Sequence, residues 1–165
     1  MGNEKGFTLI EIMIAVVVIG LLTSIAIPTF NAYRVKAYNA NATSDVRNLH
    51  THQSMFKNDH GIYAPIAVSD KGSTGLISVN VTMPSGGTEL FELRNLSADT
   101  QLIAKTDANK INVILGCRHQ AGNKIVAIDP NNPAIKEKAS STTLTAADLP
   151  TPTSADDLSS WSVLE

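Results

Sequence analysis

The side chains in this sequence that could perform chemistry are few and poorly spaced for it. The chain has four histidines and one cysteine. His50 and His52 lie two residues apart, so on a helix they would point about 200° away from each other and could not hold one metal ion. Cys117 and His119 would share one face of a strand, but zinc usually takes three or four protein ligands and no partner cluster lies nearby in sequence. The spacing therefore predicts no metal site.

The remaining candidate motifs also fail to indicate catalysis. The run Asp129–Pro133 has oxygen donors that could bind calcium, but it lacks EF-hand spacing and its composition favours a turn. The Walker A, nucleophile-elbow and zinc-protease motifs are all missing from the sequence. We expect no catalytic residue, no metal and no cofactor, and hence no enzyme. With 13 Lys+Arg against 15 Asp+Glu, the charge does not indicate a nucleic-acid partner.

One carboxylate has unusual surroundings. Glu11 lies near the start of the apolar run Phe7–Ile27, which as a helix would be about 31 Å long, close to the thickness of a bilayer. The run fits a membrane-spanning helix better than a secretory signal, because only Lys5 precedes it as a basic residue and no small-residue cleavage site follows. A carboxylate at the centre of such a helix costs about 2.5–3.5 kcal/mol, and less near an end. Glu11 therefore needs a partner.

The residues alone leave two partners open for Glu11. Thr8 and Glu11 match the capping box, in which the glutamate accepts a hydrogen bond from the amide of the threonine. Alternatively, Glu11 pairs with a cation supplied by another molecule, because a buried charge is usually paired and the run contains no basic residue. Both can hold at different stages.

The first secondary-structure element that the sequence predicts is a long helix, which carries Glu11 near its start. After Pro28 an apolar stripe, broken by one glutamine, continues at three- and four-residue steps. Its members are Val35, Tyr38, Ala42, Val46, Leu49, Gln53 and Phe56. One helix over residues 7–58, with a membrane half at 7–27, would be about 78 Å long. Gly61 suits a left-handed cap that ends this helix.

Short apolar or alternating runs follow from about Tyr63 and predict an antiparallel meander. They cover residues 76–83, 90–94, 101–105, 110–117 and 124–129. The expected fold class is α+β: a small antiparallel sheet packs one apolar face on the helix stripe and turns its other face to water. Residues 130–157 are rich in Pro, Ser, Thr and Ala and predict a surface loop, whereas 161–164 predict a last edge strand.

The residues Gly6-Phe7-Thr8-Leu9-Ile10-Glu11 after a short leader resemble the signature of type IV pilins and pseudopilins. This resemblance implies that a prepilin peptidase cuts the bond between Gly6 and Phe7, removes residues 1–6 and methylates the new amine of Phe7. It also implies that Glu11 meets the amine of Phe7 on a neighbouring subunit during filament assembly. Gly20 and Pro28 match positions near which the helix of many pilins loosens in the filament.

The similarity continues through about Tyr63, and the segment after the membrane half resembles the corresponding helix of pilins from metal-reducing bacteria. The matching positions after the membrane half are Phe30, Tyr33, Arg34, Lys36, Tyr38, Asp45 and Arg47. One departure is the lone Cys117, because many pilins close a C-terminal loop with two cysteines. The implied organisation is a leader at 1–6, the helix at 7–58, a β head at 59–129, and a loop with a final strand at 130–165.

The resemblance implies a structural subunit of a type IV pilus, which polymerises with copies of itself. The subunit would be stored in the bacterial inner membrane and moved by the assembly machinery there into an extracellular filament for adhesion, motility, DNA uptake or electron transfer. The first alternative is a type II secretion pseudopilin, although the major kind is expected to carry a calcium-binding acidic C-terminal loop. An alternative of another class is a single-pass anchor that displays a β-domain as a receptor or adhesin.

Overall fold

The computed structural model describes residues 6–164, so the expected leader residues Met1–Lys5 lie outside the described part of the chain. The chain divides into two compact units, one containing residues up to Lys36 and a second from Ala37 onward, called here the head unit. Helix α1, Leu9–His60, contributes residues to both units.

Helix α1 begins and ends about two residues later than the sequence pattern predicts. It starts at Leu9 because Thr8 caps it, and it stops at His60 because Gly61 takes a φ of +80°. The Gly61 amide donates to the Lys57 carbonyl oxygen at 2.7 Å, which closes the last turn. A left-handed residue without Cβ is the usual helix terminator, so the predicted role of Gly61 is confirmed.

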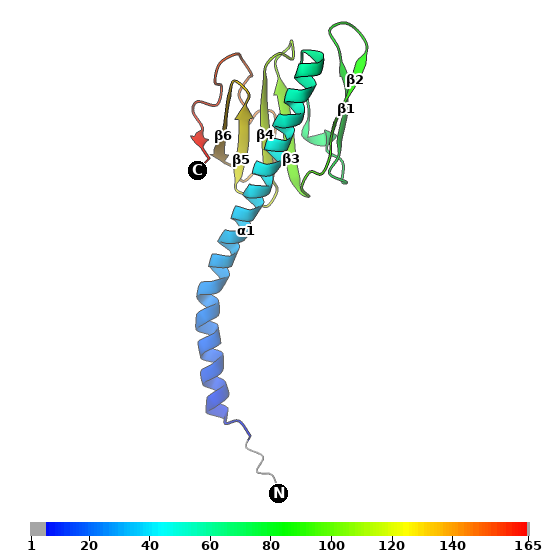
Figure 1. The fold of residues 1–165 in the computed structure, drawn as a ribbon. Coiled ribbons are helices and arrows are strands. Elements are labelled where there is room, and N and C mark those ends of the chain that lie inside the picture. The colour runs from blue at the N-terminus through cyan, green and yellow to red at the C-terminus, as the bar shows by residue number, and fades with distance from the viewer. Residues whose placement is uncertain (1–5, 165) are drawn as a thin grey trace. The chain divides into compact units, whose positions relative to one another are not determined.

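The strands of the head unit form two antiparallel sheets, where the sequence pattern suggested one. The first is the hairpin of β1 and β2, and the second is a meander of five strands in chain order from β3 to β7 (Figure 1). A 3-10 turn, η1, precedes them at Val68–Asp70. The strands are β1 Ile77–Thr82, β2 Thr88–Leu93, β3 Thr100–Thr106, β4 Val113–His119, β5 Lys124–Asp129, β6 Asn132–Ala139 and β7 Ser162–Val163.

The head portion of α1 lies across one face of the larger sheet (Figure 1). Ala42, Val46 and Leu49 are completely buried there and belong to one apolar cluster with residues of both sheets. The stripe glutamine, Gln53, is buried because its amide completes the hydrogen bonds of Ala64, donating from Nε2 to O at 2.7 Å and accepting from N at 2.9 Å. The predicted α+β class is confirmed, and the predicted stripe is buried from Ala42 to Phe56, whereas its first two members, Val35 and Tyr38, remain partly exposed.

The opposite face of the larger sheet is also buried, which contradicts the expectation that it meets water. Every residue of β4 is buried, so its side chains are covered on both faces. Leu144, Leu149 and Leu158 of the C-terminal segment supply the cover, and together with β3, β4 and β5 residues they form a second apolar cluster. A Cβ on Gly116 of β4 would lie 2.8 Å from Leu149 Cδ1, so glycine allows this close approach.

The segment predicted as a surface loop differs from that expectation in two ways. It contains a complete strand, β6, and its leucines are core residues. Polar contacts fasten it: Lys105 Nζ donates to the carbonyl oxygens of Ala146 and Leu149 at 2.9 and 2.7 Å. Strand β7 pairs with β6, as predicted for the end of the chain.

Leu149→Ala should lower the free energy of unfolding by about 2–5 kcal/mol, because it leaves a cavity between β4 and the C-terminal segment. Urea titration of the full chain in detergent micelles measures the change. The matched control is Leu90→Ala, since Leu90 is 53% exposed on β2 and its truncation should leave the midpoint almost unchanged. Equal effects of the two variants would contradict the second core.

Candidate processing and assembly site

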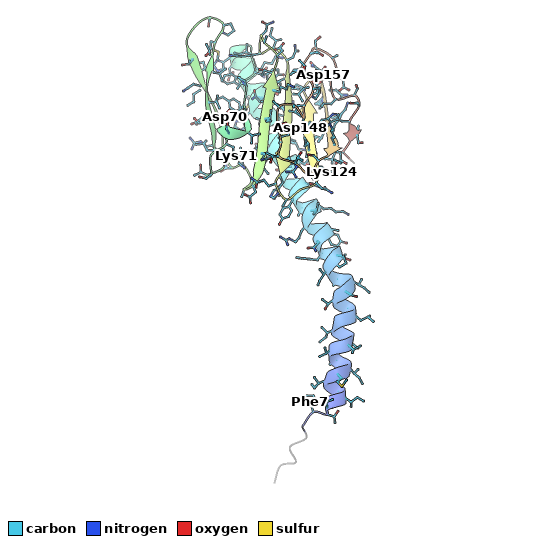
Figure 2. The ribbon with its side chains drawn as sticks, turned by 180° about the vertical axis from the view of Figure 1, so that it is seen from behind. Phe7, Asp70, Lys71, Lys124, Asp148 and Asp157 are labelled. Carbon is cyan, nitrogen blue, oxygen red and sulfur yellow. The ribbon has the colours of Figure 1, made fainter. Side chains whose placement is uncertain are left out.

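The bond between Gly6 and Phe7 lies in extended chain before the helix and is accessible. Both residues are exposed, and the Phe7 side chain is 84% exposed. Figure 2 shows Phe7 at the N-terminal end of α1. Within the described residues 6–164, the bond therefore lies outside the helix and between two exposed residues.

Thr8 and Glu11 form the capping box that their spacing predicts. The Thr8 amide and hydroxyl both donate to Glu11 Oε2 at 3.1 Å, and the Glu11 amide donates to Thr8 Oγ1 at 3.3 Å. The carboxylate is thereby fixed beside the first turn of the helix, where the macrodipole also favours negative charge. Because both Thr8 bonds end on Oε2, Oε1 points to no hydrogen-bond donor in the described part of the chain.

The helix that follows is apolar around its whole circumference. Its large apolar side chains from Leu9 to Ile27 are all more than half exposed, ranging from 51% at Val18 to 78% at Leu9. Within the described residues, α1 is the one helix that is long and apolar enough to cross a membrane. A helix with apolar surface all round requires lipid or other apolar helices as neighbours.

Gly20 and Pro28 both lie inside α1, which continues through them in the single chain. Proline has no amide hydrogen and so removes one helical hydrogen bond. Nearby hydroxyls bind carbonyl oxygens of the preceding turn: Thr23 donates to Ile19 at 2.7 Å and Thr29 to Ile25 at 3.0 Å. Local loosening of the helix at Gly20 and Pro28 in a filament stays a prediction.

The other candidate residues do not form a reactive site. Cys117 is completely buried, and this burial raises the pKa of its thiol well above the ordinary value, so the thiolate is disfavoured. His50 and His52 are half-buried on α1, and burial lowers the pKa of His50. Among residues 6–164 no three His, Cys, Asp or Glu side chains gather closely enough to hold a metal ion.

Asp129 begins a turn, as predicted, and its carboxylate is used structurally. Its Oδ1 accepts from the Asn131 amide and its Oδ2 from the Asp157 amide, each at 2.9 Å. Asp129 is only 1% exposed, so these bonds join the turn to the C-terminal segment inside the head unit. This arrangement stabilises the fold and offers no open ligand position.

The head portion of α1 also carries a buried carboxylate, Asp45, for which no role was predicted. Asp45, 3% exposed, accepts from the Ser97 amide at 3.0 Å and from the Thr100 hydroxyl at 2.7 Å. Lys71, labelled in Figure 2, donates to the Thr100 carbonyl oxygen at 2.8 Å, and burial lowers the pKa of its ammonium group. The sequence does contain an indication of this role: Asp45 lies next to Val46 and three residues after Ala42 on the apolar stripe, where an unpaired charge would be costly and a polar partner is therefore expected.

These features define a class of protein: a subunit with an apolar N-terminal helix, an accessible bond before it, and a β head that fastens the rest of the helix. The prokaryotic N-terminal methylation motif matches residues 1–27. Type II secretion system core protein G of Pectobacterium carotovorum subsp. carotovorum is 31% identical over 97 residues, covering 59% of this chain and 56% of that protein. Type IV major pilin protein PilA of Myxococcus xanthus is 38% identical over 65 residues, covering 39% of this chain and 30% of that protein.

The chain thus spans about half the length, or less, of these curated relatives. The motif and both kinds of relative support its assignment to the type IV pilin and pseudopilin family. Members of this family are structural subunits and not enzymes, and they typically form polymeric filaments after processing by prepilin peptidase. The motif and the apolar helix together indicate that the chain is anchored in a membrane.

The capping box yields a test at the start of α1. Glu11→Ala removes the acceptor of both Thr8 bonds and should weaken the helix start, whereas Glu11→Gln keeps an acceptor oxygen and should retain the cap. Hydrogen exchange of amides in residues 8–13, measured in detergent micelles, reports the difference. Identical exchange in the two variants would contradict a role for Glu11 in the cap.

Proposed function

We propose that the chain is a type IV pilus subunit, processed between Gly6 and Phe7, methylated at Phe7 and assembled into an extracellular filament. The observation that carries this proposal is the exposed apolar surface that α1 presents all round from Leu9 to Ile27. Once a subunit leaves the bilayer, that surface can avoid water only against the same surface of other copies. The inner-membrane assembly machinery would supply the transfer from lipid to filament.

The geometry at Glu11 supports the proposed pairing with a neighbouring subunit. Cleavage creates a positively charged amine at Phe7, and Glu11 Oε1 is available to accept a hydrogen bond from the amine of another copy. At about 4 Å and an effective dielectric constant near 20, such a pair attracts by roughly 4 kcal/mol before desolvation is counted. Because Oε2 takes the Thr8 bonds, the cap and the pairing between subunits are compatible.

A second candidate function is that of a type II secretion pseudopilin, which builds a short periplasmic filament. The observation that favours it is the similarity to core protein G over 97 residues. The C-terminal segment lends support to the pilus proposal, because Asp156 is paired within the chain: Lys136 Nζ donates to its two oxygens at 2.8 and 3.0 Å. These bonds lower the pKa of Asp156, so this carboxylate is paired with an ammonium group of the same chain.

Deletion of the gene in the source organism distinguishes the candidates. The pilus proposal expects loss of surface filaments in electron micrographs, with unchanged export of secreted enzymes into the medium. Wild-type filaments combined with loss of secretion would instead establish the pseudopilin function. In the wild-type strain, recovery of a chain that retains Met1, together with no filament that depends on the gene, would favour a single-pass anchored receptor or adhesin.

Complementation of that deletion tests the assembly residue. Glu11→Gln should be inserted and cleaved normally but restore few or no filaments, because it keeps the cap and removes the charge. The matched control, Glu89→Gln, removes an exposed carboxylate from β2 of the head unit and should restore wild-type filaments. Wild-type filament numbers with Glu11→Gln would leave Glu11 as a capping residue alone.

A further inference from the structure

The turn between β4 and β5 holds two consecutive side chains of α1. Asn39 and Asn123 exchange hydrogen bonds: Asn39 Nδ2 donates to Asn123 Oδ1 at 2.8 Å, and the Asn123 amide donates to Asn39 Oδ1 at 3.2 Å. A Cβ on Gly122 would lie 2.6 Å from Asn39 Oδ1, so the helix side chain rests directly on the turn backbone.

The neighbouring contact is a stack between Tyr38 of α1 and His119 at the end of β4. Their ring centroids lie 4.4 Å apart and the ring planes are 16° from parallel. His119 is only 6% exposed, and its Nδ1 accepts a hydrogen bond from the Ala121 amide at 3.1 Å. An Nδ1 that accepts carries no proton, so this arrangement requires the neutral imidazole with its hydrogen on Nε2.

We propose that Tyr38, Asn39 and the β4–β5 turn form a pH-sensitive clamp, which opens when His119 is protonated. Protonation places a hydrogen on Nδ1, directly opposite the Ala121 amide hydrogen, so two donors face each other. The imidazole must then turn away or the turn must move, and either change separates His119 from Tyr38. Because Asn39 binds the same turn, its two hydrogen bonds with Asn123 loosen as well.

Several groups act on the charge of His119, in opposite directions. The aromatic face of Tyr38 favours a cationic imidazole. The charged groups around His119 come from four segments of the chain. These are Asp45 on α1 and Asp99 in the β2–β3 loop, which favour protonation, and Lys71 before β1 and Arg118 on β4, which oppose it. Burial is the largest influence and disfavours the charged form, so the pKa of His119 is lowered from its ordinary value.

The sign of the pH effect follows from that direction. A histidine with a lowered pKa in the folded state binds fewer protons there than in the unfolded state. The clamp is therefore fully stabilising above the ordinary histidine pKa of about 6.5 and weakens as the pH falls toward the lower folded value. For each pKa unit by which the pKa of His119 in the closed clamp lies below its ordinary value, the ratio of closed to open clamp falls about tenfold between neutral and low pH.

Hydrogen exchange of the full chain in detergent micelles tests the clamp at about pH 7.5 and about pH 5, on either side of the ordinary histidine pKa. After correction for intrinsic exchange rates, protection of residues 37–42 and 119–124 should fall at the lower pH. His119→Gln should abolish this fall, because its amide oxygen can accept from Ala121 and does not titrate. The matched control is His50→Gln, which removes a half-buried histidine of α1 and should keep the wild-type response.

A titration of the His119 ring by NMR in the wild-type chain gives a second measurement that does not depend on the variant folding. A pKa below the ordinary value, with exchange changes at the same midpoint, supports the clamp. Protection in both segments that is independent of pH, or a fall that persists in His119→Gln, would overturn it. So would loss of the response in His50→Gln, because the titrating group would then lie elsewhere on α1.

Discussion

The exposed apolar surface of the first half of α1 is the constraint on which the rest of the account depends. Burial of each large aliphatic side chain is worth about 1.5–3 kcal/mol, and this segment presents many of them on every side. Its only carboxylate, Glu11, lies in the first turn, where the capping box and the helix dipole make a negative charge least costly. The segment is therefore suited to a lipid environment before assembly and to packing against the same segment of other copies after assembly.

The head unit is subject to a different constraint, because it must remain folded in water while it packs against one apolar face of the second half of α1. It does so with two cores, one under α1 and one under the C-terminal segment. Three buried polar side chains are paired at the junctions: Asp45 with Ser97 of the β2–β3 loop, Gln53 with Ala64, and Lys136 with Asp156. Each of these pairs also fixes one segment of chain relative to its neighbour, which apolar contacts alone do less specifically.

The sequence predicts those parts of the structure that depend on local spacing. Thr8 and Glu11 are three residues apart, Gly61 follows the last stripe residue, and the first five strands alternate or are uniformly apolar, so all of these were found. The second core was missed because Leu144, Leu149 and Leu158 follow neither helix nor strand periodicity and are separated by polar residues. Strand β6 was missed because Pro133 and Lys136 are residue types that are typical of surface loops. Lys136 is buried in the folded chain because it pairs with Asp156, twenty residues further along. Asp45 and His119 gained roles from neighbours more than fifty residues away along the chain, which no local pattern contains.

The most direct test of the central claim is mass spectrometry of the N-terminal peptide of this chain in filaments sheared from the cell surface. We expect a subunit that begins at Phe7 with one methyl group on its amine, so that the apolar segment and Glu11 enter the filament together. A peptide that still contains Met1–Gly6, or complete confinement of the processed chain to the membrane fraction, would contradict it.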